Sequence, residues 1–394
     1  MMAKRSIQSD SVRCGIDRLE TVDRLLKHQT VGLLTSAASI DHEFRHSVNR
    51  VAERYQLKAL FAPEHGIRGE QQAGALIDHQ VDAQTGLPVY SLYGENKAPS
   101  DEQLAGIDVF VIDLQDVGAR FYTYLYSMIY CMKRCAEMGI PVVVLDRPNP
   151  VGGNRVEGPV LDPAFSSFVG LYPVPVRYGL TIAEFAGYIN HSQSIGCELS
   201  VAPLSGWHRN ACYDETGLTW VSPSPNIPTI DSALVYLGTC LFEGTNLSEG
   251  RGTTHPFELI GAPWLDHDRV LSQLNKTLLT GCHLRPCWFQ PGGSKHQART
   301  CAGFQIHILD RQTFKPYTAA VTLLDAIRQT HDAFAFLPPD HPDRPWFIDH
   351  LSGSDTIRRP DFDLTAHCEQ ADAESALFRE KNKACWLYQE DQTG

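Results

Sequence analysis

Carboxylates stand beside arginines in three short segments of this sequence. The segments are 63–69 (PEHGIRG), 113–120 (DLQDVGAR) and 146–153 (DRPNPVGG), and Gly or Pro residues constrain the backbone of each. Turn-forming residues are expected wherever a strand ends, so one such segment alone is an ordinary loop. Three of them with the same residue types favour one shared cleft, in which paired carboxylates could serve as acid and base.

A fourth segment, 241–254 (LFEGTNLSEGRGTT), is denser in polar side chains. It holds two glutamates, one arginine, one asparagine and four hydroxyl side chains, separated by three glycines. Such a loop needs ligands for its polar groups, and its glycines allow the backbone to approach a substrate closely. The proline-locked loop 223–228 (PSPNIP) could present Asn226 toward the same cleft.

Several familiar sites are absent from the sequence. It contains no GxGxxG after a strand, no GxxxxGK[ST] and no GxSxG, so we expect no dinucleotide, no other cofactor and no serine nucleophile. Among the sixteen histidines, His42 and His46 have HExxH spacing (HEFRH), and the others show no ligand spacing. His65, His79 and His255 could also meet in space and form a metal site, but we expect no metal.

Aromatic residues accompany the polar segments. Paired carboxylates, aromatic platforms and many hydrogen-bonding groups suit a carbohydrate, whose hydrolysis needs one acid and one base or nucleophile. The tyrosines concerned are Tyr90, Tyr93, Tyr122, Tyr124 and Tyr126.

The elements that must position these residues follow from short apolar runs. Such runs alternate with helix-like stretches, which predicts a doubly wound α/β domain with a mostly parallel sheet covered on both faces. Ligands of such sheets bind outside the carboxyl ends of the strands, which is where the first three polar segments fall. The expected strands are 30–35, 57–62, 107–114, 141–145 and 198–204; the expected helices are 16–27, 42–55, 122–138 and 181–192, the last with a Thr181–Glu184 capping box.

The pattern changes near residue 262. Helix-like stretches at 269–279, 317–329 and 371–388 surround two segments of strand character, 283–290 and 301–309. We therefore expect a catalytic domain over 1–262 and a smaller α+β auxiliary domain over 263–394.

Composition excludes other classes of protein. The chain has 394 residues, 43% of them hydrophobic, which is globular, and its net charge of −12 opposes binding to nucleic acid or anionic lipid. No apolar stretch approaches the roughly 20 residues of a membrane helix, and the first residues lack the apolar core of a signal peptide. Eleven scattered cysteines without CxxC favour free thiols, so we expect the cytoplasm.

The motifs together resemble a known family. Six blocks are similar, in order, to signature segments of the NamZ family of exo-β-N-acetylmuramidases: APEHGIRG, SLYG, DLQDVGARFYTY, LDRPNPVGG with VEGPVL, SPSPNIP and LFEGTNLSEGRGTTHPFELIGAPW. These blocks run from about residue 30 to 265. The resemblance implies a Rossmann-like catalytic domain with a smaller auxiliary domain. It also implies removal of non-reducing β-1,4-linked N-acetylmuramic acid from peptidoglycan fragments, a small saccharide substrate.

This substrate suggests roles for the polar residues. Glu64 follows a buried strand between Pro and His, a partly desolvated place that suits a general acid. Asp116 and Glu249 compete for the second carboxylate role, and His65 could orient either carboxylate. The sequence leaves retaining, inverting and acetamido-assisted routes open.

N-acetylmuramic acid also carries a lactyl carboxylate, which a guanidinium can bind with two hydrogen bonds. We favour Arg251 for this contact because it lies in the glycine-rich segment. Glu64, Asp116, Arg147 and Arg251 are expected to line one cleft. The other expected substrate contacts are Arg68, Arg120, Arg147, Tyr122, Asn149, Asn226 and Asn246. Two other readings stay open: a sugar-binding protein without catalysis, and a metal-dependent hydrolase.

Overall fold

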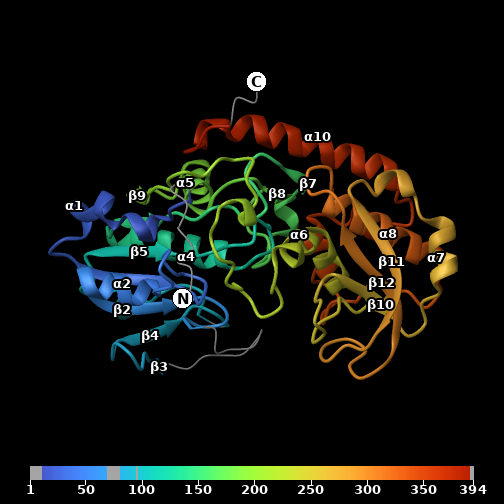
Figure 1. The fold of residues 1–394 in the computed structure, drawn as a ribbon, viewed down its shortest axis with the longest axis horizontal. Coiled ribbons are helices and arrows are strands. Elements are labelled where there is room, and N and C mark those ends of the chain that lie inside the picture. The colour runs from blue at the N-terminus through green and yellow to red at the C-terminus, as the bar shows by residue number, and fades with distance from the viewer. Residues whose placement is uncertain (1–10, 69–79, 95, 391–394) are drawn as a thin grey trace, which may run out of the picture.

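The computed structural model describes residues 11–68, 80–94 and 96–390. Figure 1 shows two parts side by side, one around a seven-stranded sheet and a smaller one around a three-stranded sheet. Helix α10 (Leu364–Asn382) lies along one side of the molecule and reaches across both parts (Figure 1).

The seven-stranded sheet has the order β3-β4-β2-β1-β5-β6-β9. All its pairings are parallel except that of β3 with β4. The order reverses at β1, as in doubly wound sheets that bind ligands beyond the carboxyl ends of their strands. This confirms the predicted Rossmann-like α/β fold. The strands are β1 (Thr30–Thr35), β2 (Gln56–Ala62), β3 (Gln80–Val81), β4 (Pro88–Ser91), β5 (Val109–Asp113), β6 (Val142–Leu145) and β9 (Leu199–Ala202).

Alternate residues of each strand face two separate cores. In β5, Phe110 and Ile112 pack with helices α4 and α5, whereas Val109 and Val111 pack with η1, α1 and α2. Apolar side chains on both faces explain why these strands read as continuous apolar runs. The helices of this part are α1 (Asp23–Leu26), α2 (Ser47–Arg54), α3 (Asp101–Leu104), α4 (Tyr124–Met138) and α5 (Ile182–Ser192), with the 3-10 helix η1 (Gly15–Val22).

Local capping residues set several helix boundaries. Thr181 caps α5 and forms the predicted capping box with Glu184. Helix α2 is shorter than the expected 42–55 because His46 caps it and residues 41–45 form a turn. The expected helix over 16–27 is divided into η1 and α1 at Val22, whose φ of −114° and ψ of 6° are not helical. Arg18, inside η1, is non-helical as well.

The smaller part is α+β in character. Its antiparallel sheet has the order β10-β12-β11, and β11 and β12 match the two expected strands. Helix α10 begins before the expected residue 371, because Asp363 caps it. The antiparallel pair of β7 (Glu157–Val160) and β8 (Pro175–Arg177) packs against α10. The other elements are β10 (Leu259–Ala262), β11 (Cys282–Phe289), β12 (Cys301–Ile308), α6 (Ile230–Thr239), α7 (His267–Gln273), α8 (Pro316–Thr330) and α9 (Phe347–Ser352).

The contacts of residues 230–262 bear on the domain boundary. Helix α6 packs on α8, and β10 pairs with β12. Both elements therefore join later residues rather than the seven-stranded sheet. A boundary at residue 262 stays a prediction, and these contacts favour an earlier one.

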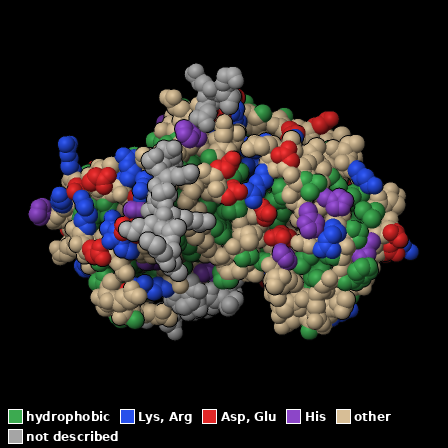
Figure 2. Space-filling model, in the orientation of Figure 1, with side chains coloured by type: hydrophobic (Ala, Val, Ile, Leu, Met, Phe, Trp, Pro, Cys, Tyr) green, Lys and Arg blue, Asp and Glu red, His purple; other side chains and the backbone are tan. Residues whose placement is uncertain are grey.

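The molecule has a surface of mixed charge and an interior that contains many thiols. On the face in Figure 2, Lys and Arg side chains are interspersed with Asp and Glu. All eleven cysteines are free thiols, and ten of them are buried. Among the described residues, no helix is both long and apolar enough to cross a membrane.

Candidate active site

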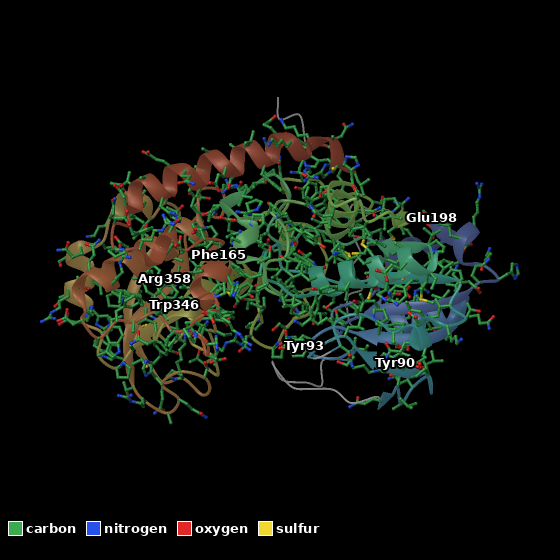
Figure 3. All side chains as sticks on the ribbon, turned by 180° about the vertical axis from the view of Figure 1, so that it is seen from behind. Tyr90, Tyr93, Phe165, Glu198, Trp346 and Arg358 are labelled. Atoms are coloured by element: carbon green, nitrogen blue, oxygen red, sulfur yellow. The ribbon has the colours of Figure 1, made fainter. Side chains whose placement is uncertain are left out.

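A cavity of about 230 Å³ lies beyond the carboxyl ends of β2, β4 and β5. Glu64 and His65 reach it from the loop after β2, Tyr93 from the loop after β4, and residues 121–123 from the segment after β5. Figure 3 shows Tyr93 on the side of its sheet that faces the smaller part. The rest of the lining is Phe168, Val169, Ser224, Asn226, Ile227, Tyr236, Glu243, Arg251 and Phe257.

Glu64 is held in the cavity wall by its neighbours. The Thr123 hydroxyl donates to Glu64 Oε2 at 3.3 Å, and the Tyr124 hydroxyl lies 2.9 Å from the Glu64 carbonyl and 2.8 Å from that of Pro223. Tyr124 thereby joins the loop after β2 to the proline-locked loop. Burial, together with the charge of Glu64, raises the pKa of Tyr93 to about 12.

Arg251 lies between two carboxylates. Its Nη2 donates to Glu243 Oε1, and its Nε lies 3.0 Å from Glu249 Oε1. The guanidinium also sits 5.1 Å from the ring centroid of Phe257. Burial raises the pKa of Glu243 and the charge of Glu249 adds to this, although Arg251 opposes it. The positive charge of Arg251 in the cavity wall is therefore shared between the carboxylates of Glu243 and Glu249.

Lys295, in the loop between β11 and β12, supports Arg251 and Glu249 from outside the cavity. Lys295 Nζ donates to the carbonyls of Phe242 and Thr245 at 2.6 and 2.9 Å and lies 3.0 Å from Glu249 Oε2. A Cβ on Gly252 would come within 2.7 Å of the backbone at 292–293, so a glycine is required at this approach. The smaller part thus helps to build the cavity wall.

The structure brings together five of the twelve expected site residues. Glu64, His65, Tyr122, Asn226 and Arg251 all line the cavity. Their catalytic and binding roles stay predictions. The other seven residues have protein partners of their own and do not line this cavity.

Asp116 and Glu249, the expected second carboxylates, are buried. Asp116 accepts hydrogen bonds from Tyr178 and from the Gly118 amide, and burial raises its pKa to about 6. Glu249 lies behind Arg251, where its side chain is 2% exposed. These contacts favour structural roles for both.

Three of the expected arginines are held by the protein. Arg68 pairs with Asp82 at 2.7 and 3.0 Å, and Arg147 pairs with Asp113 at 2.6 and 2.9 Å. Fully buried Arg120 donates instead to the carbonyls of residues 159, 174 and 351, at 2.8, 2.9 and 2.7 Å. Arg147 and Asp116 therefore do not join Glu64 and Arg251 in one cleft.

The remaining two asparagines tie loops together. Asn149 donates to the Leu180 carbonyl at 2.8 Å and accepts from the Val151 amide at 3.1 Å. Asn246 donates to the Ala333 carbonyl at 2.7 Å and accepts from the Ala335 amide at 3.0 Å. Their side-chain amides are therefore engaged by backbone groups.

Some lining residues had no expected role. Glu243 was counted in the polar segment, and Tyr93 among the nearby aromatic residues, but neither was assigned to the site. Phe168 and Tyr236 lie outside any motif, and only the fold brings them to the cavity. Phe257 lies in the last motif but was given no role. Tyr90, by contrast, lies on strand β4 and packs against Phe61 with ring centroids 5.5 Å apart.

The histidines proposed as metal ligands do not form a cluster in the described part of the chain. His255 lies 3.1 Å from Glu258, and His79 is outside the described residues. No group of three or more His, Cys, Asp or Glu residues there could hold a metal ion. The expectation of metal-free activity stays a prediction.

Known proteins are similar to this chain in sequence and in fold. Residues 31–231 match the family model of the exo-β-N-acetylmuramidase NamZ N-terminal region, and residues 234–388 match that of its C-terminal region. The peptidoglycan β-N-acetylmuramidase NamZ of Bacillus subtilis (strain 168) is 46% identical over 333 residues, 84% of this chain and 80% of that protein.

Crystal structures of two DUF1343 family proteins from Bacteroides fragilis NCTC 9343 are also similar. One has a TM-score of 0.85 at 32% identity and covers 96% of this chain and 100% of its own. The other has a TM-score of 0.77 at 28% identity, with 96% and 99% covered. The two family models together span most of the sequence, and the chain belongs to the NamZ family of exo-β-N-acetylmuramidases, which are glycosidases.

Proposed function

We propose that the protein removes non-reducing terminal β-1,4-linked N-acetylmuramic acid from peptidoglycan fragments. The observation that carries this proposal is that Glu64 and Arg251 line the same cavity. A proton donor and a guanidinium in one small site match a sugar that has a glycosidic oxygen to protonate and a carboxylate to bind. The 46% identity to a peptidoglycan β-N-acetylmuramidase supports the same substrate.

In this proposal Arg251 binds the lactyl carboxylate and Glu64 protonates the leaving oxygen. Tyr93, Tyr122 and Phe257 supply aromatic surface for the sugar. The cavity volume of about 230 Å³ is below the usual range of about 300–1,000 Å³ for ligand sites. A small cavity favours one terminal sugar over a long stretch of glycan, which is the requirement of an exo-acting enzyme.

The second carboxylate of the expected pair stays a prediction. Neither Asp116 nor Glu249 lines the cavity, whereas Glu243 does and is held by Arg251. The anomer released first separates the inverting route from the other two. An inverting enzyme releases the α-anomer from a β-linkage, while retaining and acetamido-assisted routes release the β-anomer. Proton NMR during the first minutes of turnover reads this directly.

The direct test uses two disaccharides that differ only in the order of their sugars. We expect free N-acetylmuramic acid from N-acetylmuramyl-β-1,4-N-acetylglucosamine and no cleavage of N-acetylglucosaminyl-β-1,4-N-acetylmuramic acid. Binding without cleavage of either would indicate a sugar-binding protein. Loss of cleavage with EDTA that a divalent ion restores would indicate a metal-dependent hydrolase.

We also propose that the protein works in a reducing compartment such as the cytoplasm. Eleven free thiols, ten of them buried, support this proposal because exported proteins tend to oxidise paired cysteines. Cell fractionation followed by detection with an antibody tests it, and recovery with the secreted fraction would contradict it.

A further inference from the structure

Four charged side chains form one connected network at the cavity wall. Arg251 contacts Glu243 and Glu249, and Lys295 contacts Glu249 from the far side. Two of these residues, Glu243 and Arg251, also line the cavity. The network is therefore continuous from the cavity surface to the β11–β12 loop.

The network is electrically balanced before any ligand arrives. Two carboxylates face two cations, and the side chains are only 2% to 26% exposed. A ligand carboxylate would add a fifth charge and leave the group with one excess negative charge. Uncompensated charge in such a place is costly, so its arrival must be balanced.

The cations of the network cannot supply this balance alone. Lys295 donates hydrogen bonds to the carbonyls of Phe242 and Thr245 and forms an ion pair with Glu249. Glu249 lies between Lys295 and Arg251, so two cations stabilise its charge. Within the network, the remaining group that can change its charge at the cavity surface is Glu243.

The surroundings of Glu243 favour proton uptake there. Burial and the nearby charge of Glu249 raise its pKa already, and a ligand carboxylate beside Arg251 would raise it further. Other titratable groups surround Glu243. Tyr236 and Cys240 are its neighbours, and the cavity lining adds Glu64, His65, Tyr93 and Tyr122. The titratable groups on the helices packed against Glu243 have partners of their own: Asp349 pairs with Arg358, His350 contacts the Phe165 carbonyl, Asp325 pairs with Arg328, and Tyr317 contacts His367.

We propose that Glu243 takes up one proton when the carboxylate of N-acetylmuramic acid binds at Arg251. The guanidinium then pairs with the ligand, and neutral Glu243 becomes a hydrogen-bond donor beside it. One negative charge enters with the ligand and one is removed by the proton, so the network stays balanced. Glu243 is thereby a specificity-determining residue for the carboxylate-bearing sugar. This inference rests on the proposed function, in which Arg251 binds the lactyl group.

The test counts protons during binding. N-acetylmuramic acid is titrated into the full-length protein in two buffers of different ionisation enthalpy, from about pH 5 to about pH 8. We expect uptake that approaches one proton in part of this range, and affinity that falls by up to about tenfold per pH unit there. N-acetylglucosamine, which has no carboxylate, should bind with no such uptake.

Variants identify the group that takes the proton. Glu243→Gln keeps the size of the side chain and a donor but cannot titrate, so uptake should vanish and the affinity should become independent of pH. Asp372→Asn removes a carboxylate that pairs with Lys315 on the surface, and it should behave as the wild type. Uptake that persists in Glu243→Gln would place the proton on another group, such as His65, and overturn the inference.

The outcome is separable from that of the proposed function. Failure to bind N-acetylmuramic acid or to cleave the disaccharide would contradict the function itself. Binding and cleavage with no proton uptake at any pH in the range would overturn only the role of Glu243. The wild-type measurement decides this even if the variant does not fold.

Discussion

Glu64 and Arg251 line one cavity although the two parts of the molecule supply them separately. Glu64 follows strand β2 of the seven-stranded sheet, and Arg251 lies between α6 and β10, which pack with the smaller part. The cavity wall is therefore complete only when both parts are in place. Lys295 strengthens this link because it comes from the loop between β11 and β12.

Replacement of Glu64 by glutamine should remove the transferable proton while preserving shape and hydrogen bonding. General acid–base catalysis contributes roughly 10²–10⁴-fold, so kcat on the disaccharide should fall by about that factor. Binding of N-acetylmuramic acid, measured by calorimetry, should persist. Activated aryl glycosides need less protonation of the leaving group and should lose less. Near-full turnover on the disaccharide would place the acid elsewhere.

Replacement of Arg251 by alanine should reduce the selectivity for substrates that carry N-acetylmuramic acid. A hydrogen bond to a charged group contributes about 1.5–3 kcal/mol, so the preference for N-acetylmuramic acid over N-acetylglucosamine substrates should shrink by roughly one to two decades. The ratio of kcat/KM for the two substrates measures this. An unchanged ratio would mean that a group other than Arg251 binds the lactyl carboxylate.

The sequence predicted the sheet well because its strands carry apolar side chains on both faces. Val109 to Ile112 fill two cores at once, so the run is visible without any structure. Strand β4 is short and half-buried, and the sequence pattern predicts no strand there. Helix α10 begins earlier than predicted because its buried stripe includes the polar residues His367, Ser375 and Asn382, which weaken the apolar pattern.

The site was harder to predict because residue type does not reveal the partner. Arg147 and Arg251 look alike in the sequence, because each lies within two residues of a carboxylate in a segment that contains glycines. Arg147 is sequestered by Asp113, which ends the adjacent strand, and only the parallel register of β5 and β6 brings the two together. The carboxyl edge of the sheet thus holds structural ion pairs as well as the cavity.

The Asp113–Arg147 pair should contribute to stability. Asp113→Ala would leave the Arg147 charge buried and unpaired, and breaking such a pair costs about 3–5 kcal/mol. Urea unfolding should show this loss. Asp372→Ala is the matched control, because its pair with Lys315 is half exposed and such pairs contribute about 0–1 kcal/mol. Equal effects of the two substitutions would contradict the prediction.

Asp116 should make stability depend on pH. Burial raises its pKa from 3.8 to about 6, so the folded protein holds this proton more tightly than the unfolded chain. The stabilisation is complete below about pH 4 and is lost as the pH rises through about 6. A shift of about two units corresponds to about 3 kcal/mol. Relative to wild type, Asp116→Asn should therefore gain about this much between about pH 4 and about pH 7 in urea unfolding.

The same variant separates structure from catalysis. With Asp116 outside the cavity lining, Asp116→Asn should retain turnover within a few-fold of wild type when equal amounts of folded protein are compared. A loss of about 100-fold or more would restore Asp116 as the second catalytic carboxylate.

Lys295 should act on substrate selectivity from outside the cavity. Lys295→Met removes the cation that pairs with Glu249 from outside the cavity. Arg251 must then compensate the charge of Glu249 as well as that of Glu243, and the network has a net negative charge before the ligand arrives. KM for the N-acetylmuramic acid disaccharide should rise about tenfold or more, with kcat changed less. Lys295→Arg keeps the charge and should recover part of the affinity.

Two comparisons separate this effect from damage to the loop. Gln297 contacts the Gly292 carbonyl at 3.0 Å within the same loop, and Gln297→Ala should leave KM unchanged. A merely structural role for Lys295 would lower the unfolding free energy and weaken N-acetylmuramic acid and N-acetylglucosamine ligands equally. If Lys295→Met keeps the wild-type preference between these two sugars, the β11–β12 loop does not tune Arg251.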